Sequence, residues 1–197
     1  MDFEKFIGSW MQQIADKKGV ILDMGGGERF QKWLAPYKHL FEGSDYKSFD
    51  YDASTKPDVV GDIHAIPLKD NSVDSIICSS VLEHIENPIV ASKELHRVLK
   101  PGGILFVYVP SIYPYHARKG HYPDYWRFFD DTLLFLFKDF KQVKIEKRGG
   151  YFRALFFFMP LQHKLRFIID PLAKFLDSVF KTNRRTTTSG YYVFAVK

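Results

Sequence analysis

The feature that most constrains the fold is a glycine turn that follows a short apolar run near the N-terminus. The run VILD occupies residues 20–23, and three glycines, Gly25, Gly26 and Gly27, follow one residue later. Glycines let the backbone turn tightly and approach a ligand closely, while a helix that starts beyond the turn presents unpaired N–H groups. Because ERFQKWLAPY comes next, we predict a strand, a tight turn and a helix.

Strand-like and helix-like patterns alternate along most of the chain. Apolar residues from Phe3 to Ile14 recur at helical spacing, and the same spacing recurs in PIVASKELHRVLKPGG and in DDTLLFLFKDF (130–140). Such alternation implies an α/β fold with a mostly parallel central sheet, right-handed crossovers and helices on both faces. The predicted strands are 20–23, 46–50, 58–61, 73–80, 103–110, 141–147 and 189–197.

The composition is that of one globular domain. Apolar residues make up 46% of the chain and charged residues 26%, which excludes a disordered or fibrous protein. A length of 197 residues suffices for one domain with a sizeable core, so we expect a single domain over 1–197. The single cysteine, Cys78, excludes an intrachain disulfide, and the start MDFEKF lacks the features of a secretory signal. We therefore expect a cytoplasmic protein.

The segment 151–181 interrupts the alternation of strands and helices. It contains ALFFFMPL, an apolar run shorter than the ~20 residues of a membrane-spanning helix. An apolar stripe at helical spacing follows, and we expect a second helix to start at Asp170 and Pro171, since proline suits a first turn. We therefore predict a helical, apolar insertion before the last strand. The stripe consists of Leu161, Leu165, Ile168, Leu172, Phe175, Leu176 and Val179.

The net charge of +5 is distributed unevenly. Residues 1–140 carry 16 basic and 20 acidic side chains, whereas residues 141–197 carry 12 basic and 3 acidic ones. The C-terminal part should therefore favour an anionic surface or partner. For segment 151–181 three arrangements stay open: packing on the protein's own sheet, a homodimer interface, or peripheral contact with an anionic membrane. A nucleic-acid partner is not expected, because the basic residues alternate with apolar ones rather than with base-reading groups.

An acidic residue at the end of the second predicted strand is a candidate ribose ligand. Asp50 lies 23 residues beyond Gly27, in the region where Rossmann folds place an acid that accepts hydrogen bonds from ribose hydroxyls. Asp45 and Asp52 are the competing candidates. Asp50 is preferred because it ends the strand pattern and precedes a polar loop.

Five segments in sequence then give a specific resemblance. VILDMGGG, the strand that ends at Asp50, GDIHAIP, VDSIICSSVLEH and RVLKPGGILFV follow the order of the class I S-adenosylmethionine-dependent methyltransferases, in particular the methyltransferase type 11 family. The resemblance covers about residues 19–110. It implies a Rossmann-like methyltransferase fold with an antiparallel C-terminal strand, S-adenosylmethionine as the cofactor, and methyltransferase activity.

The resemblance also assigns residues to the cofactor. Asp23 stands where the family's first-motif acid helps to hold the methionine end, and Asp62 and Ile63 look like the pair that contacts the adenine. The family's first motif often reads acid, x, Gly, x, Gly, x, Gly, whereas Arg29 holds the third glycine position here, so the amino-acid end of the cofactor would meet a side chain. The cofactor-binding residues that we expect are Asp23, Gly25, Gly27, Asp50, Asp62, Ile63 and Ser79.

A polar and aromatic segment, PSIYPYHARKGHYPDYWRFF, follows the fifth strand. It resembles the H…PxDYxR segment of family members found with polysaccharide and glycan biosynthesis, and it leaves the edge where open α/β sheets bind ligands. We expect it to form the acceptor wall; packed aromatics and an Asp124–Arg127 ion pair are the structural alternative. No metal site is expected, because no matching ligand cluster accompanies His116, His121 and Asp124. The candidate catalytic residues are His116, His121 and Asp124, and the candidate substrate-binding residues are His84, Tyr125, Trp126 and Arg127.

These residues predict methyl transfer from S-adenosylmethionine to a small-molecule, glycan or lipid-linked acceptor. The sulfonium carries its own leaving group, so the reaction depends mainly on holding a nucleophile in line with the methyl group. For a hydroxyl acceptor, His116 or His121 is the candidate base. Two alternatives stay open: a non-catalytic binding protein with a methyltransferase fold, and a nicotinamide-dependent oxidoreductase, whose GxGxxG turn is matched poorly because Phe30 takes the last position.

Overall fold

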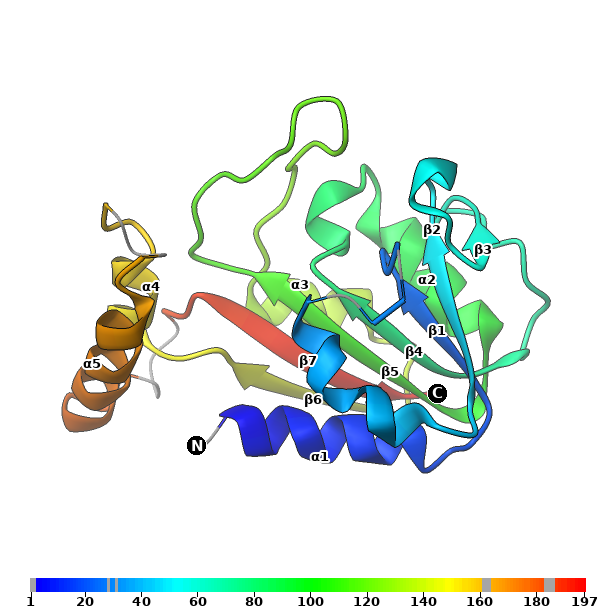
Figure 1. Cartoon of the computed structure of the whole chain (residues 1–197), viewed down its shortest axis with the longest axis horizontal. Coiled ribbons are helices and arrows are strands. Elements are labelled where there is room, and N and C mark those ends of the chain that lie inside the picture. The colour runs from blue at the N-terminus through cyan, green and yellow to red at the C-terminus, as the bar shows by residue number, and fades with distance from the viewer. Residues whose placement is uncertain (1–2, 28, 31, 161–163, 183–186) are drawn as a thin grey trace.

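The computed structural model describes residues 3–27, 29–30, 32–160, 164–182 and 187–197, which form one sheet flanked by helices (Figure 1). Its strands are β1 (Val20–Met24), β2 (Asp45–Asp50), β3 (Val59–Val60), β4 (Val73–Ser79), β5 (Leu99–Pro110), β6 (Gln142–Lys147) and β7 (Gly190–Val196). Their order is β3-β2-β1-β4-β5-β7-β6. Strands β1 to β5 pair in parallel, and β7 lies antiparallel between β5 and β6. The predicted α/β sheet and its antiparallel C-terminal strand are confirmed.

Each face of the sheet packs against its own helices, because successive side chains of a strand point to opposite faces. In β1, Ile21 is buried in a core with Met11, whereas the next residue, Leu22, is buried in a second core with Leu95. The predicted helices on both faces are therefore confirmed (Figure 1). The first face is covered by α1 (Phe3–Ala15) and the 3-10 helix η1 (Lys32–Phe41), and the second by α2 (Pro88–Val98) and α3 (Asp130–Leu136).

Parallel pairing brings the carboxyl ends of β1, β2, β4 and β5 to one edge of the sheet. The connections that leave this edge are the glycine turn after β1, a short 3-10 helix η2 (Ala53–Thr55) after β2, a second one, η3 (Leu82–His84), after β4, and the segment 111–129 after β5. In open α/β sheets this edge is where ligands bind.

The helix after the glycine turn differs from the prediction. The sequence favoured an α-helix that starts directly after the glycines, but residues 32–41 form a 3-10 helix with Pro36 inside it. Proline lacks the backbone N–H that an interior α-helical hydrogen bond requires, which explains why a regular α-helix does not form here. Residues 28 and 31, at the predicted helix start, lie outside the described residues.

The insertion contains two helices, α4 (Tyr151–Phe156) and α5 (Arg166–Val179), which we call the α4–α5 hairpin. The prediction that the second helix starts at Asp170 was wrong: α5 begins at Arg166 and includes Pro171. Pro171 removes one backbone hydrogen bond, to the carbonyl of Phe167, and that residue is exposed to water, which can replace the donor.

The buried carboxylate of Asp177 holds the hairpin together. It accepts hydrogen bonds from the backbone N–H groups of Gly150 and Phe152, both at 2.9 Å, and from the hydroxyl of Thr182. It therefore satisfies amides at the start of α4 from the end of α5. The hairpin lies beside the ends of β6 and β7, apart from the helices that cover the two faces (Figure 1). None of the described helices is long and apolar enough to cross a bilayer.

The hairpin leaves the predicted apolar stripe exposed. Ala173 and Asp177 face the interior of the molecule, whereas the stripe is on the other side of α5. Leu176 is half-buried, and Leu161 lies outside the described residues. The exposed apolar face of α5 consists of Leu165, Ile168, Leu172, Phe175 and Val179, with side chains that are 41–63% exposed.

Candidate active site

One large cavity of about 1140 Å³ lies at the carboxyl edge of the parallel strands. It has two halves: one is lined by the ends of β1 and β2 and by the segment after β3, and the other by η3 and segment 111–129. Of the predicted cofactor residues, Asp23, Gly25, Asp50, Asp62, Ile63 and Ser79 line it. Of the predicted acceptor-side residues, His84, His116, His121 and Tyr125 line it.

The glycine turn leaves space that a larger residue would fill. The N–H groups of Gly25 and Gly26 donate to the carbonyl of Phe49, at 2.8 and 3.3 Å, which fixes the turn against the end of β2. Gly25 has a φ of +67°, and a Cβ atom there would lie 2.8 Å from a methyl carbon of Val81. The turn therefore requires glycine and provides a cradle where the expected cofactor fits. Gly27, also predicted, is buried and lies outside the described lining.

Asp23 is a buried carboxylate at the end of β1. Its Oδ2 accepts a hydrogen bond from the hydroxyl of Tyr46 on β2. Burial raises the pKa of Asp23 to about 6, although the Tyr46 hydrogen bond opposes the shift. A buried carboxylate in a cavity gains most from a cationic ligand group, and the ammonium of S-adenosylmethionine is such a group. The buried carboxylate of Asp23 therefore suits the ammonium group of the expected cofactor.

Asp50, the preferred one of the three acidic candidates for the ribose, lies at the carboxyl edge of the sheet. It is the last residue of β2 and lines the cavity. Asp45 begins the same strand, at the opposite edge of the sheet, and forms a surface ion pair with Lys47. Asp52 also lines the cavity, but its carboxylate accepts a hydrogen bond from Ser54 N–H and caps η2. Asp50 itself accepts a hydrogen bond from Asp52 N–H at 3.1 Å, so the geometry disfavours Asp45 and leaves the preference for Asp50 over Asp52 as a prediction.

Asp62 and Ile63 lie beside each other after β3. Ile63 is buried and packs with Phe49 in the core, while its neighbour Asp62 accepts hydrogen bonds from the backbone N–H of His64 at 2.8 Å and from its ring at 2.6 Å. These contacts lower the pKa of Asp62 and keep it ionised. Ser79 ends β4 on the cavity wall. This pairing of an apolar surface with an acceptor is what an adenine ring and its amino group need.

Arg29, the residue at the family's third glycine position, is occupied elsewhere. Its guanidinium binds Asp58 with two hydrogen bonds, at 2.7 and 2.5 Å, which together with the contacts from Ser48 lower the pKa of Asp58 to about 2. Arg29 lies outside the cavity lining. The expectation that the amino-acid end of the cofactor meets this side chain stays a prediction, and it would require Arg29 to leave Asp58.

Segment 111–129 is fixed to η3 by backbone contacts. The carbonyl of Glu83 accepts hydrogen bonds from the N–H groups of Tyr125 and Trp126, at 2.8 and 3.2 Å. The indole N–H of Trp126 donates to the carbonyl of Ile85 at 2.9 Å. The segment thus covers η3 and forms the wall opposite the cofactor half.

Asp124 and Arg127 stabilise this wall through contacts within segment 111–129. They form a bidentate ion pair at 2.6 and 2.7 Å, and Arg127 also donates to the carbonyls of Tyr113 and Pro114. Burial opposes ionisation of Asp124, but Arg127 and the backbone N–H of His116 outweigh it and lower the pKa of Asp124 to about 2. Asp124, Trp126 and Arg127 lie outside the described lining. In the structure these three residues therefore hold segment 111–129 in place and do not line the cavity.

Glu83 and Arg148 are cavity-lining residues that the sequence did not single out for a role. Glu83 is 1% exposed, and its Oε2 has no hydrogen-bond partner among the described residues. Arg148 donates to the hydroxyl of Tyr108 at 2.6 Å and forms no ion pair with a carboxylate in the described part of the chain. Glu83 resembles a solvated acid at a helix start, and Arg148 follows a strand without any motif, so neither gives a local signal.

The comparisons with known proteins agree with the geometry. A family model described as a methyltransferase domain matches residues 22–107. A demethylmenaquinone methyltransferase of Staphylococcus aureus is 36% identical over 70 residues, which is 36% of this chain and 29% of that protein. An uncharacterized 37.1 kDa protein in transposon TN4556 of Streptomyces fradiae is 45% identical over 52 residues, or 26% of this chain and 15% of that one. The matches thus span less than a third of these curated relatives.

Solved structures cover nearly the whole chain. A SAM-dependent methyltransferase from Archaeoglobus fulgidus superposes with a TM-score of 0.58 and 16% identity, over 98% of this chain and 94% of that one. One from Mesorhizobium loti gives a TM-score of 0.57 at 16% identity, over 96% of each chain. At such identity these likenesses establish the fold. The family match, to residues 22–107, covers the residues that build the cofactor half of the cavity, so this part of the chain is similar to the S-adenosylmethionine-dependent methyltransferases.

Proposed function

We propose that this chain transfers the methyl group of S-adenosylmethionine to an acceptor bound in the half of the cavity that segment 111–129 covers. The observation that carries this proposal is the continuity of the cavity, whose volume of about 1140 Å³ joins the cofactor half to the polar second half. Pockets for single small ligands measure ~300–1,000 Å³. The cavity therefore has room for the cofactor and a part of a second molecule.

Methyl transfer requires little from the protein beyond the correct positioning of the cofactor and the acceptor. The cofactor supplies an activated methyl group, whose bond to sulfur breaks as a bond to the acceptor's oxygen or nitrogen forms, and the electron pair of the broken bond stays on sulfur. The chain must align the acceptor and exclude water. A hydroxyl acceptor must also lose a proton, and His116 and His121, both on the cavity wall, are the candidate bases.

The second half of the cavity suits an acceptor that carries an anionic group. Arg148 lines it and is held by Tyr108 rather than by a carboxylate of the described residues. A guanidinium without a protein counter-ion is free to bind phosphate or carboxylate with two parallel hydrogen bonds. We therefore propose a phosphorylated or carboxylated acceptor, and small-molecule, glycan and lipid-linked compounds all include such groups.

The position and the surface of the α4–α5 hairpin favour a lipid-linked acceptor. Phe157, directly after α4, packs its ring against Tyr113 at 4.8 Å between centroids, and Tyr113 lines the cavity. The exposed apolar face of α5 is accompanied by exposed Lys164, Lys174 and Lys181. Apolar side chains beside lysines favour the interface of an anionic membrane. We propose that the hairpin rests on such a surface and brings the acceptor half of the cavity next to it.

Ligand stabilisation and label transfer test the methyltransferase proposal. S-adenosylmethionine and its demethylated product should raise the melting temperature of the purified chain, because a ligand that binds only the native state stabilises it, whereas NAD should not. With labelled cofactor, the chain should transfer label to acidic compounds of a lipid extract. Stabilisation by NAD alone would contradict the proposal, and cofactor binding without transfer to lipid, glycan or small-molecule fractions would favour a non-catalytic binding protein.

Vesicle flotation tests the membrane proposal. The chain should float with vesicles that contain phosphatidylglycerol and stay behind with phosphatidylcholine alone, and high salt should weaken the binding because lysine contacts are screened. Phe175→Glu should lower the vesicle-binding constant at least tenfold, since burying one phenylalanine contributes ~1.5–3 kcal/mol. Phe135→Glu on α3 is the matched control, because Phe135 is also about half exposed, at 52%, and lies away from the hairpin.

Two results would overturn the membrane proposal. One is binding to neither kind of vesicle by a chain that is monomeric in solution. The other is a dimer in solution that Phe175→Glu dissociates and Phe135→Glu does not, which would assign the exposed face of α5 to a homodimer interface.

A further inference from the structure

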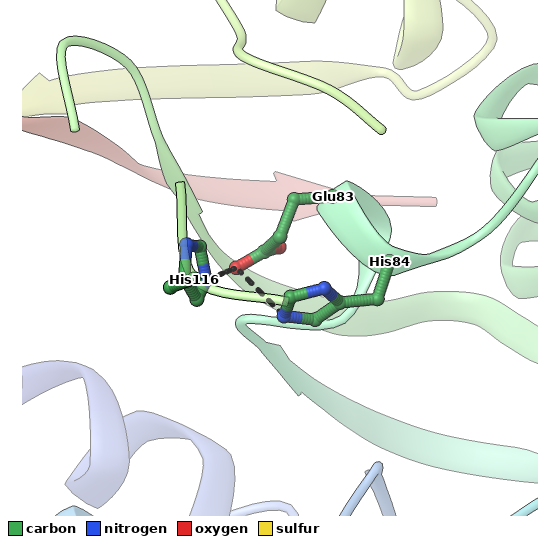
Figure 2. Close-up of side chains that lie close together, drawn as sticks. All are labelled: Glu83, His84 and His116. Atoms are coloured by element: carbon green, nitrogen blue, oxygen red, sulfur yellow. Dashed lines mark ion pairs between the residues drawn. The ribbon is translucent and has the colours of Figure 1, made fainter. Parts of the chain in front are cut away.

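Three side chains with metal-binding atoms converge on the acceptor side of the cavity. Figure 2 shows Glu83 and His84 from η3 and His116 from segment 111–129, turned toward one another. Glu83 Oε1 lies 3.9 Å from Nε2 of His84 and 3.9 Å from Nε2 of His116. One ligand atom from each of the three residues lies within 4.8 Å of the others. The separations are too long for direct hydrogen bonds and leave a space between the three atoms.

Both imidazole rings are oriented by their other nitrogen. His84 Nδ1 lies 2.6 Å from the carbonyl oxygen of Pro123, which can only accept a hydrogen bond, so Nδ1 carries the proton. His116 Nδ1 lies 3.2 Å from the carbonyl of Pro114 and 3.2 Å from the carboxylate of Asp124. In the neutral rings each Nε2 therefore presents its lone pair to the space between the residues. Metal-binding histidines are held in this way, with the second N–H on a carbonyl or a carboxylate.

Glu83 supplies an independent indication of a cation-binding site. Its side chain is 1% exposed, and Oε2 has no hydrogen-bond partner among the described residues. Leaving a buried carboxyl oxygen without a partner is unfavourable. The nearby guanidinium of Arg127 is bound to Asp124 and to backbone carbonyls, so it does not serve Glu83. A cation that lies between Glu83 and the two histidines, and that both carboxylate oxygens contact, would neutralise Glu83 and give Oε2 a partner.

We propose that Glu83, His84 and His116 bind one divalent transition-metal ion, of the zinc class, on the acceptor side of the cavity. Two imidazoles and a carboxylate suit zinc or cobalt and disfavour magnesium and calcium, which prefer oxygen ligands. Ligand distances of ~2.0–2.2 Å in tetrahedral geometry put ligand atoms ~3.4 Å apart. The two 3.9 Å separations must therefore shorten by about 0.5 Å, which side-chain rotation can provide. Three protein ligands leave a position open for another molecule.

The open position suggests what the ion is for. A cation there would hold an acceptor oxygen next to the methyl group and lower the pKa of an acceptor hydroxyl. Only this role rests on the proposed methyl transfer; binding of the ion does not.

Metal titration of the whole, tag-free chain without cofactor tests the site. After treatment with a chelator and its removal, Co²⁺ should bind at one equivalent per chain and give the visible absorption of a cobalt site with nitrogen and oxygen ligands. Zn²⁺ should displace it and raise the melting temperature. Glu83→Gln, which keeps the shape of the side chain, and His116→Ala should each lower metal affinity at least tenfold.

The controls keep the result interpretable. His39→Ala removes an exposed histidine away from the cavity and should leave metal affinity unchanged. A cooperative thermal unfolding transition of Glu83→Gln without metal or cofactor would show that the variant folds. Absence of stoichiometric metal binding would overturn the proposal, and so would affinity that Glu83→Gln and His116→Ala both leave unchanged. Because no cofactor or acceptor is present in the titration, failure of the methyltransferase proposal would leave its outcome untouched.

Discussion

Replacing Asp50 by alanine is expected to weaken S-adenosylmethionine binding by about 1–3 kcal/mol, or roughly 5- to 150-fold. Asp50 ends β2 on the cavity wall, where its carboxylate can accept hydrogen bonds from the ribose hydroxyls. The variant loses a charged acceptor, and the hydroxyls that it served would stay partly buried without a partner. Titration calorimetry of the parent chain and the variant measures the difference directly.

Two other aspartates of the same region serve as controls for Asp50. Asp45→Ala removes the same side chain from the opposite end of β2, where it pairs with exposed Lys47, so cofactor affinity should stay within about twofold of the parent, since surface pairs contribute little. Asp52→Ala removes the cap of η2 and should affect local stability more than cofactor affinity. If Asp50→Ala bound the cofactor as tightly as the parent, another acid would have to be the ribose ligand, and a large loss at Asp45 or Asp52 would identify it.

The cofactor half of the cavity could be predicted from the sequence because its residues end strands. Asp23, Asp50 and Ser79 each lie at or within one residue of the carboxyl end of a strand, and the apolar patterns locate those ends closely. Parallel topology then brings the ends to one edge of the sheet. Local patterns thus contain almost all the information that this half of the site needs.

The acceptor half could not be predicted in the same way, because it depends on how segment 111–129 folds over η3. His84 contacts the carbonyl of Pro123, 39 residues away, and no local pattern specifies that contact. Glu83 is buried, and its carbonyl binds the N–H groups of Tyr125 and Trp126, which are also distant in the sequence. The sequence therefore singled out the histidines but not the carboxylate between them, which is why the metal site that we propose was not expected.

The same limit applies to residues whose role is indirect. Asp124 and Arg127 were candidates for catalysis and substrate binding, since they lie in a polar motif beside two histidines. In the structure they bind each other, and Arg127 binds carbonyls of the same segment, so they support the wall of the cavity. An ion pair three residues apart has the same sequence pattern in either role, and only the direction of the side chains distinguishes the two.

Replacing Asp23 by asparagine is expected to stabilise the chain without cofactor at neutral pH and to weaken cofactor binding. Burial raises the pKa of Asp23 from 3.8 to about 6, so the folded chain holds this proton more tightly than the unfolded chain. The contribution of Asp23 to the free energy of unfolding is therefore fully present below pH ~4 and is lost as the pH rises through 6, by a total of ~3 kcal/mol. Asparagine removes this loss, because its amide does not ionise and can still accept the Tyr46 hydrogen bond.

Denaturant unfolding of the parent chain and of Asp23→Asn, between pH 4 and pH 8, measures this effect. The difference in free energy of unfolding should grow in favour of the variant as the pH rises from 4 to 8. With saturating S-adenosylmethionine the order should reverse, because the ammonium group compensates the charge of Asp23 and has no carboxylate to bind in the variant. A difference that does not change with pH would mean that burial does not raise the pKa of Asp23. A difference that changes with pH but does not reverse with cofactor would mean that the buried carboxylate serves the fold and not the methionine end of the ligand.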